Sequence, residues 1–281
     1  MLRTSSSLRV LGPRDLDAVI EVLDRDPVAN VFIASRVRAV GLDPWRLGGE
    51  MWGHVVDGRL EALCHAGANL VPAGAGPEAV RAFAGRARRQ GRRCATIVGP
   101  RDMVAPMWQL LEPGWGPARD VRPDQPLLAT SSPSPVRPDP GVRRVRPDEL
   151  DLLLPACIAM FTEEVGVSPV AADGGTAYRA RVAELIAAGR SFARIDDGRV
   201  VFKAEVGSVT PRACQVQGVW VDPELRGRGL SVGGMAAVVD LALADVAPIV
   251  SLYVNDFNEA ARAAYRRVGF EQCGTFMSVL F

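Results

Sequence analysis

The chain has 281 residues, 48% of them apolar, which is enough to bury one large hydrophobic core or two of ordinary size. A formal net charge of +1 excludes a whole-molecule field that would attract nucleic acid or an anionic membrane, and no apolar run is long enough to span a bilayer. With only two histidines and five scattered cysteines, none in C-x-x-C spacing, we expect no metal site, and reduced thiols in a cytoplasmic protein.

The first predicted elements are a short strand and a hairpin. Residues 1–7 lack the apolar core of a signal peptide. Residues 8–11 form a strand that leads into a helix, whose start is marked by a proline and acidic residues. Residues 54–60 then read as two strands joined by Asp57-Gly58, a pair that favours a tight hairpin turn.

A glycine-containing loop and a basic helix come next. The loop, residues 69–78, contains two glycines but no arginine. The helix, at about residues 78–93, is amphipathic and rich in arginine. We expect these arginines to form a solvated face, because no aromatic residues are interleaved to stack on nucleic-acid bases.

A linker divides the chain into two parts of similar size. Residues 131–140 are rich in proline and serine, and can form neither a helix nor a central strand. The predicted organisation is therefore a first domain at residues 1–130, the linker at 131–140, and a second domain at 141–281.

The second domain opens with the same order of elements as the first, about 140 residues later. A strand near residues 142–145 leads into a helix at about 147–161, and the hairpin at 194–200 again has Asp-Gly at its turn. Each match alone can arise by chance, but the shared order and offset favour a tandem duplication. The remaining elements are a helix at 175–188, strands at 192–195, 200–206, 213–221 and 249–254, a helix at 258–268, and a C-terminal strand pair ending at residue 281.

A basic loop with two glycines separates the strand at 213–221 from an apolar-periodic helix at about 231–243. Its glycines let main-chain amides converge, and the first turn of the following helix leaves amides unpaired at the positive end of the helix dipole. The two arginines beside them carry planar forks suited to phosphate oxygens. The segment, Arg226-Gly227-Arg228-Gly229-Leu230-Ser231, is therefore predicted to hold a pyrophosphate.

Three other interpretations of this loop compete with a pyrophosphate site of this kind. A Walker-type loop needs a lysine after its last glycine, but the only lysine of the chain is Lys203. The loop contains the first two glycines of a dinucleotide-binding fingerprint. However, Val232 occupies the position of the third glycine, and residues 222–225 separate the strand from the loop, where the fingerprint has almost no intervening residues. A solvated loop with no chemical role is the third.

The whole second half favours a fourth interpretation. Two motifs carry it: Arg226-x-x-Gly229-x-Ser231, and Asn258-x-x-Ala261-x-x-x-Tyr265-x-x-x-Gly269-Phe270. In this order and separation they resemble the two signatures of the GNAT (GCN5-related) N-acetyltransferases. Ser231 stands where the family usually has glycine or alanine, a small-for-small change. Because residues 69–78 lack the arginine, the chain is similar to two-lobed actinobacterial members whose N-terminal half has lost cofactor binding.

The resemblance implies a mixed α/β fold, that is, an α+β mixed sheet, with acetyl-coenzyme A as co-substrate and no metal. It implies cofactor contacts at Val219, Val221, Arg226, Gly227, Arg228, Gly229, Leu230, Ser231, Asn258 and Tyr265. In this family the strand before the loop splays from its neighbour and pairs with the pantetheine arm, and the tyrosine protonates the departing thiolate. A core role for Tyr265 and a helix N-cap role for Asn258 are the alternatives from the residues themselves.

The general base is left open among three carboxylates. Many relatives place a glutamate on the strand before the loop, but this chain offers only Gln215 and Gln217 there, which cannot accept a proton. Glu163 and Glu164, expected in the loop between the first two helices of the domain, and Glu205 are the candidates. A water chain, or an amine that loses its proton before binding, is the alternative.

The predicted function is an N-acetyltransferase that moves an acetyl group from acetyl-coenzyme A to a primary amine by direct attack. The acceptor can be a small amine or a peptide or protein amine, with no nucleic acid or membrane involved. The absent strand glutamate motivates a rival hypothesis, a non-catalytic sensor that binds acyl-coenzyme A. The length of the acyl group and the oligomeric state are not encoded in these motifs.

Overall fold

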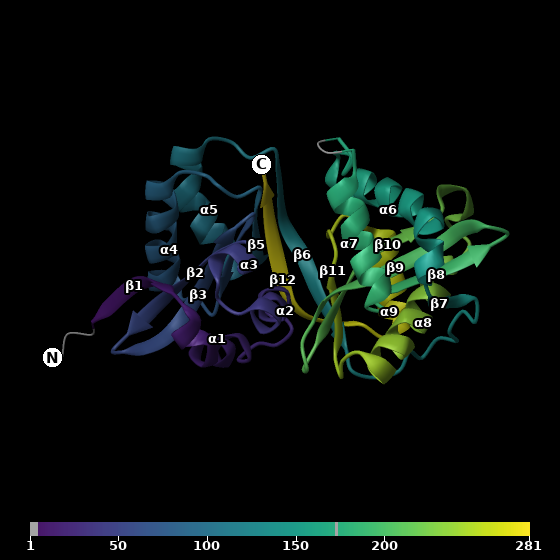
Figure 1. The fold of residues 1–281 in the computed structure, drawn as a ribbon, viewed down its shortest axis with the longest axis horizontal. Helices are drawn as coiled ribbons and strands as arrows, with labels where there is room; N and C mark the ends of the chain where they lie inside the picture. The colour runs from purple at the N-terminus through teal and green to yellow at the C-terminus, as the bar shows by residue number, and fades with distance from the viewer. Residues whose placement is uncertain (1–4, 172–173) are drawn as a thin grey trace. The chain divides into compact units, whose positions relative to one another are not determined.

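The structure is a computed structural model that describes residues 5–171 and 174–281 (Figure 1). Part of the N-terminal segment read above as lacking a signal-peptide core, residues 1–4, lies outside the described residues. Strands and helices alternate in a mixed α/β arrangement, which confirms the expected fold class. The described residues form two compact units. Unit 1 holds the chain up to Leu128 with Tyr253–Phe257 and Gln272–Phe281, and unit 2 holds Ala129–Leu252 and Asn258–Glu271.

Unit 1 is a sheet with helices on both faces. Adjacent residues of one strand, Met51 and Trp52, belong to separate apolar clusters, because side chains alternate across a strand. The strands lie in the order β1-β2-β3-β4-β5-β12-β6. The elements are β1 (Ser6–Leu11), α1 (Leu16–Leu23), α2 (Val31–Val40), α3 (Pro44–Leu47), β2 (Gly49–Val56), β3 (Arg59–Gly67), β4 (Asn69–Ala73), α4 (Pro77–Gln90), β5 (Thr96–Pro100), α5 (Arg101–Trp115), β6 (Asp120–Thr130) and β12 (Glu271–Leu280).

Unit 2 repeats this plan with its strands in the order β11-β10-β9-β8-β7. Its elements are β7 (Val142–Arg144), α6 (Leu150–Val165), α7 (Thr176–Ala187), β8 (Ser191–Asp196), β9 (Arg199–Val209), β10 (Cys214–Val221), α8 (Leu230–Asp245), β11 (Val250–Tyr253) and α9 (Glu259–Val268). Strands β7 to β10 pair in antiparallel fashion, whereas β10 and β11 are parallel and are connected through α8. A parallel pair needs such a crossover.

The two units share local details, of which the sequence repeat predicted the hairpin turns. Asp57 and Asp197, at the tips of the two hairpins, have φ of +47° and +48°, and they are the positive-φ residues other than glycine in the described part of the chain. In each unit an arginine also forms a two-pronged ion pair with an acid six residues later, shown by Arg9 with Asp15 in unit 1. These matches support the tandem duplication.

The C-terminal strand differs from expectation. The sequence places it as part of a strand pair within the second domain, at residues 141–281, but β12 is one long strand and its residues from Gln272 onward group with unit 1. There it pairs with β5 in antiparallel fashion, Phe276 opposite Pro100. The physical reason is burial, since Met277 and Val279 complete the apolar cluster beneath α4 and α5. The division at 131–140 otherwise stays a prediction.

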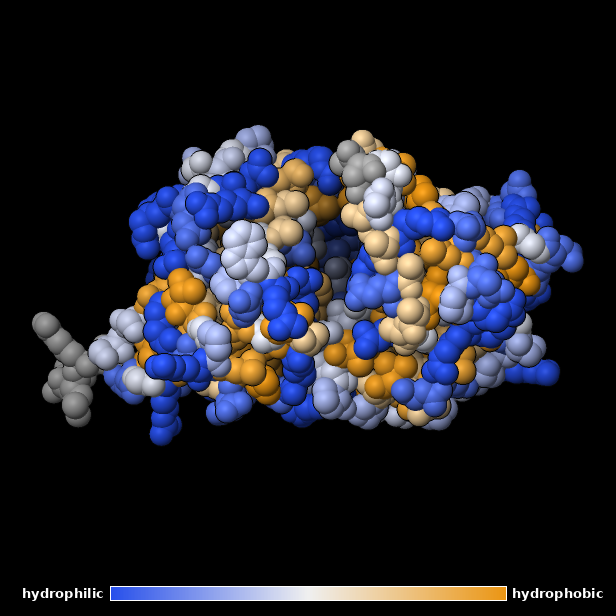
Figure 2. Space-filling view, viewed as in Figure 1, coloured by the Kyte–Doolittle hydropathy of each residue, from blue (hydrophilic) through white to orange (hydrophobic). Residues whose placement is uncertain are grey.

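The surface of the described residues mixes hydrophilic and hydrophobic side chains, as the face drawn in Figure 2 shows. Large apolar side chains that reach solvent include Trp45, Val167 and Phe257, which lie far apart in the sequence. Within the described ranges, no helix is both long and apolar enough to cross a bilayer.

Candidate functional site

The predicted pyrophosphate loop lies between β10 and α8 of unit 2. Gly227 and Gly229 have φ of +77° and +81°, in the left-handed region that glycine enters without strain. No other atom lies within 4 Å of the place where a Cβ would be built at either glycine, so the backbone faces open space. Helix α8 begins at Leu230, with Ser231 in its first turn. The loop therefore presents a helix N-terminus next to an exposed backbone, which suits an anion.

Arg226 is anchored at this loop by its neighbours. Its Nε donates to the carbonyl of Val221 at 3.1 Å. Its two terminal nitrogens donate to the carboxylate of Glu163 at 2.8 and 2.7 Å, and this carboxylate raises the pKa of the guanidinium. Arg228, two residues on, is exposed. The structure thus brings one predicted base candidate, Glu163, against one predicted phosphate ligand.

Glu163 and Glu164 do not lie in a connecting loop, which corrects the sequence-based placement. Helix α6 continues through Val165 and ends at Gly166, whose φ of +79° is typical of a helix C-cap. Both glutamates therefore occupy the last turn of a helix. Glu164 contributes to the raised pKa of buried Tyr265, although burial of the phenol is the larger cause.

Strand β10 separates from β11 after Gln215. The two strands pair at Cys214 with Val250 and at Gln215 with Ser251, and β10 then continues along β9. The register with β9 shifts between Gln217 and Trp220, which places Gly218 and Val219 in a bulge. The backbone groups of Val219 are therefore outside the ladder.

The other predicted strand contact, Val221, behaves differently. It lies back in register opposite Phe202 of β9, and its carbonyl already accepts from Arg226. Of the two valines expected to meet the cofactor arm, the structure leaves only Val219 outside the pairing with β9.

Behind the bulge lies a buried polar cluster that includes Glu205. One carboxylate oxygen of Glu205 accepts from Lys203 Nζ at 3.1 Å, and the other accepts from Gln217 Nε2 at 3.0 Å. Lys203 Nζ also lies 3.4 Å from Cys157 Sγ. Sequence reasoning named Glu205 but missed Lys203 and Cys157. The signal available was that Lys203 is the one lysine in a chain whose other basic side chains, histidine aside, are arginines.

Tyr265 and Asn258 both lie on α9. Tyr265 is 6% exposed and its ring packs edge-on against Phe270, with centroids 5.9 Å apart. Burial raises the pKa of its phenol, so the hydroxyl keeps its proton at neutral pH. Asn258 caps α9, since its side-chain oxygen accepts from the Ala261 amide at 3.1 Å. This geometry supports the capping interpretation and leaves the cofactor role of Asn258 a prediction.

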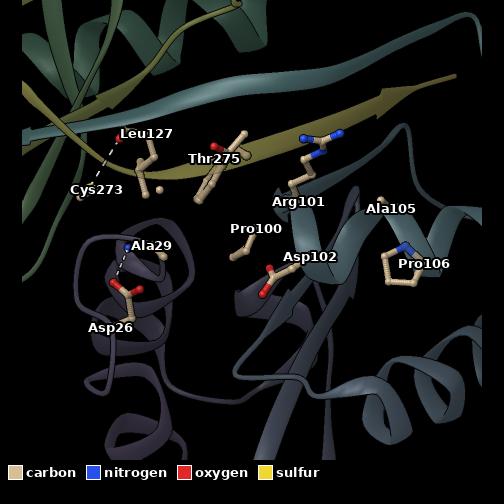
Figure 3. Close-up of a pocket in the computed structure, with 12 residues that line it drawn as sticks. Asp26, Ala29, Pro100, Arg101, Asp102, Ala105, Pro106, Leu127, Cys273 and Thr275 are labelled. Carbon is tan, nitrogen blue, oxygen red and sulfur yellow. Dashed lines mark hydrogen bonds between the residues drawn. The ribbon is translucent and has the colours of Figure 1, made fainter.

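A separate cavity of about 560 Å³ lies in unit 1, at the start of α5. Figure 3 shows Asp26, Asp102 and Thr275 around it, with Cys273 close to Leu127. None of the predicted site residues lines it. Within the described residues, no group of three or more His, Cys, Asp or Glu side chains could hold a metal ion.

Comparisons with known proteins divide the chain in two. Residues 161–270 match the acetyltransferase (GNAT) family, and residues 49–153 match a domain of unknown function (DUF4081). A search of the curated proteins gave no match.

Solved structures match the chain over nearly its full length. An acetyltransferase of the GNAT family from Colwellia psychrerythraea is 13% identical, with 98% of this chain and 99% of that chain covered and a TM-score of 0.58. A tandem GNAT protein from the clavulanic acid biosynthesis pathway is 16% identical, with 98% of both chains covered and a TM-score of 0.58. A GCN5-related N-acetyltransferase from Sphaerobacter thermophilus is 18% identical, with 98% and 95% covered and a TM-score of 0.57. At these identities the likeness establishes the fold.

Proposed function

We propose that the protein is an N-acetyltransferase using acetyl-coenzyme A and a primary amine, because residues 161–270 match the acetyltransferase (GNAT) family. The observation that carries the proposal is the junction of two features in unit 2. The strand whose bulge exposes backbone groups leads, through the short segment 222–225, into the glycine loop at the start of α8, so a strand-pairing edge and an anion-binding loop are close together in the chain.

The residues present fit the carrier. The open backbone at Gly227 and Gly229, the small side chain of Ser231 and the first-turn amides of α8 can hold a diphosphate, with Arg226 and Arg228 supplying charge. When bound, acetyl-coenzyme A supplies the thioester carbonyl and a thiolate leaving group. Strand β10, unpaired with β11 beyond Gln215, offers its edge to the extended part of the carrier.

Three groups then divide the chemistry. A bulge amide, that of Val219, donates to the oxygen that becomes negative when the amine attacks. Tyr265, held protonated by burial, donates the proton that the departing sulfur needs. Glu205 lies closest to the bulge among the candidate carboxylates and accepts the proton of the amine, directly or through one water molecule. Glu163 is not given this role, because both of its carboxylate oxygens accept hydrogen bonds from Arg226 of the loop.

One observation favours the rival function, a non-catalytic acyl-coenzyme A sensor. Both carboxylate oxygens of Glu205 already accept hydrogen bonds, from Lys203 and from Gln217, so its capacity as a base is partly used. The sensor shares the carrier site with the enzyme and differs only in the chemistry.

Two measurements test these functions. Titration calorimetry with acetyl-coenzyme A tests the shared part, and absence of binding removes both. Thiol release measured over a panel of small amines, peptides and lysine-containing proteins then separates them. Turnover that falls sharply in Tyr265→Phe while carrier affinity holds supports the enzyme, whereas binding with no turnover on any amine supports the sensor. Competition by a nicotinamide dinucleotide would instead favour the dinucleotide interpretation.

A further inference from the structure

Lys203 is exceptional in both sequence and position. Of the 33 Lys and Arg residues in the chain, it alone is lysine. It is 1% exposed, whereas lysine is among the residues least often fully buried unless paired. A buried ammonium group in a protein that otherwise uses arginine needs a local explanation.

Lys203 Nζ lies close to two side chains and to the bulge of β10. Nζ contacts Glu205 Oε2 at 3.1 Å and Cys157 Sγ at 3.4 Å. A Cβ built at Gly218 would lie 3.1 Å from Nζ and 3.2 Å from Glu205 Cδ. The ammonium, a compact point charge, therefore lies directly behind the β10 bulge.

The burial of Glu205 makes its cation necessary. Glu205 is 8% exposed, and a carboxylate taken out of water tends to pick up a proton unless a positive charge or hydrogen bonds compensate. Lys203 and Gln217 supply that compensation, one to each oxygen. Three uncharged groups also lie near Glu205: the thiol of Cys157 on α6, the phenol of Tyr178 on α7, and Ser191 opposite it on β8. Glu164, at the end of α6, adds a negative charge near Tyr178.

We propose that Lys203 is a positioning residue that keeps the Glu205 carboxylate ionised and aimed at the β10 bulge. The proposal rests on the proposed function, because an ionised Glu205 matters only where it accepts the proton of an attacking amine. Lys203 itself touches neither substrate in this scheme. It acts through Glu205, and its ammonium stays protonated because the nearby carboxylate offsets the cost of burial.

The test compares Lys203→Met with Lys203→Arg in the full chain, following kcat/KM for an amine between pH 5.5 and 9.5. Without its cation, Glu205 should hold its proton to higher pH. We expect the acid limb of Lys203→Met to move up to about pH 8, with about a tenfold loss at pH 7 that is largely recovered at pH 9. Lys203→Arg should keep the acid limb in place even where the larger side chain lowers Tm. Cys157→Ala, which removes the thiol contact alone, should also leave the limb in place.

A direct readout separates this proposal from the proposed function. Infrared spectra of the purified proteins report a protonated carboxyl band, which is assigned to Glu205 if adding Glu205→Gln to Lys203→Met removes it. The band should appear at pH 7 in Lys203→Met and be absent in the parent chain and in Lys203→Arg. If Lys203→Met lowers Tm but shows neither the band nor a shifted limb, the lysine is only structural and the proposal is wrong. If no amine is turned over, the proposed enzyme fails while the infrared band still decides the role of Lys203.

Discussion

Arg226 and Glu163 form a two-pronged ion pair, with nitrogen–oxygen distances of 2.8 and 2.7 Å, between the pyrophosphate loop and the last turn of α6. The two side chains are 44% and 55% exposed. Water screens such a pair, so its contribution to folding is small. The location of the ion pair matters more than its energy. Glu163 occupies the terminal nitrogens of Arg226, which are the groups that would otherwise bind an anion at the loop.

Replacing Glu163 by Gln should therefore strengthen binding of acetyl-coenzyme A. The variant frees the Arg226 fork and removes a negative charge beside the loop, so we expect affinity to rise about two- to fivefold. Tm should change little. Titration calorimetry at low and at physiological salt measures the effect, which should shrink as salt rises.

Asp151→Asn is the matched control for this change. Asp151 lies in the first turn of the same helix and pairs with the exposed Arg179. Neutralising it changes net charge by the same amount without touching the loop. Equal gains in affinity from both variants would show that overall charge, and not release of Arg226, is responsible.

Reversing the charges of the loop, with Arg226→Glu and Arg228→Glu together, should weaken acetyl-coenzyme A binding by at least about 100-fold. Two attractive charges become repulsive next to a diphosphate, while the exposed side chains contribute little to folding. Binding and Tm are measured in parallel. The double variant Arg266→Glu with Arg267→Glu, on the exposed end of α9, makes the same charge change elsewhere in unit 2. Retained affinity in the loop variant would exclude the pyrophosphate role.

Tyr265→Phe should lower turnover about 100-fold and leave acetyl-coenzyme A affinity nearly unchanged, because only the proton donor is lost. Burial holds the pKa of Tyr265 above its ordinary value near 10. Its protonated form therefore stabilises the fold fully below about pH 10, and this contribution is lost as pH rises through the folded-state pKa. Turnover by the unmodified chain should accordingly not fall through ionisation of Tyr265 below about pH 10.

The comparison variant for this tyrosine is Tyr178→Phe. Tyr178 is a second phenol, less buried than Tyr265, and its hydroxyl donates to the Cys157 carbonyl at 2.9 Å. Losing that bond should lower Tm while reducing turnover far less than Tyr265→Phe does. Similar losses of turnover in the two variants would indicate a packing role for Tyr265.

The features that could be predicted from the sequence are those with local causes. The hairpin turns at Asp57 and Asp197, the N-cap at Asn258 and the left-handed glycines of the loop each follow from a few neighbouring residues. The end of α6 was missed by one turn. Nothing in residues 162–165 stops a helix, and the C-cap glycine, Gly166, marks the true boundary.

The features that could not be predicted depend on residues far apart in the chain. Glu163 and Arg226 are separated by 63 positions, and Lys203 and Cys157 by 46. Strand β12 pairs with β5 although the two strands are on opposite sides of the linker in the sequence. Such contacts are selected by packing of whole elements, which periodicity and turn chemistry do not report.

Gly218→Ala should disturb the bulge on which the proposed chemistry depends. Gly218 has a φ of +60°, and an added Cβ would lie 3.0 to 3.2 Å from Met160, Lys203 and Glu205. Backbone strain and crowding should lower the free energy of unfolding by about 1–3 kcal/mol. Gly198→Ala, at a φ of +75° with open space around it, carries the strain without the crowding. Unfolding in urea measures both. A larger loss of turnover in Gly218→Ala than in Gly198→Ala is expected.

Glu149→Gln should destabilise the fold in a pH-dependent manner. Arg143 donates to both oxygens of Glu149, at 2.8 and 2.6 Å, and lowers the pKa of this carboxyl to about 2. Since the folded-state pKa lies below the unfolded value near 4.3, the ionised carboxylate stabilises the fold above about pH 4.3, and this contribution is lost as pH falls toward 2. Arg143 is 43% exposed, so we expect the variant to lose only about 1 kcal/mol at pH 7.

Urea unfolding at several pH values between 3 and 7 measures the difference in free energy of unfolding between the parent chain and Glu149→Gln. This difference should become smaller as the pH falls. Asp148→Asn, beside it but 74% exposed, is the control and should cost little at any pH. In unit 1, Asp15→Asn removes the equivalent partner of Arg9, and the pKa of Asp15 is lowered by the same kind of contact. A similar pH dependence in both variants would show that the ion pairs Arg9–Asp15 and Arg143–Glu149 stabilise their units in the same way. A gap that stays constant with pH would mean that the carboxylates act through packing alone.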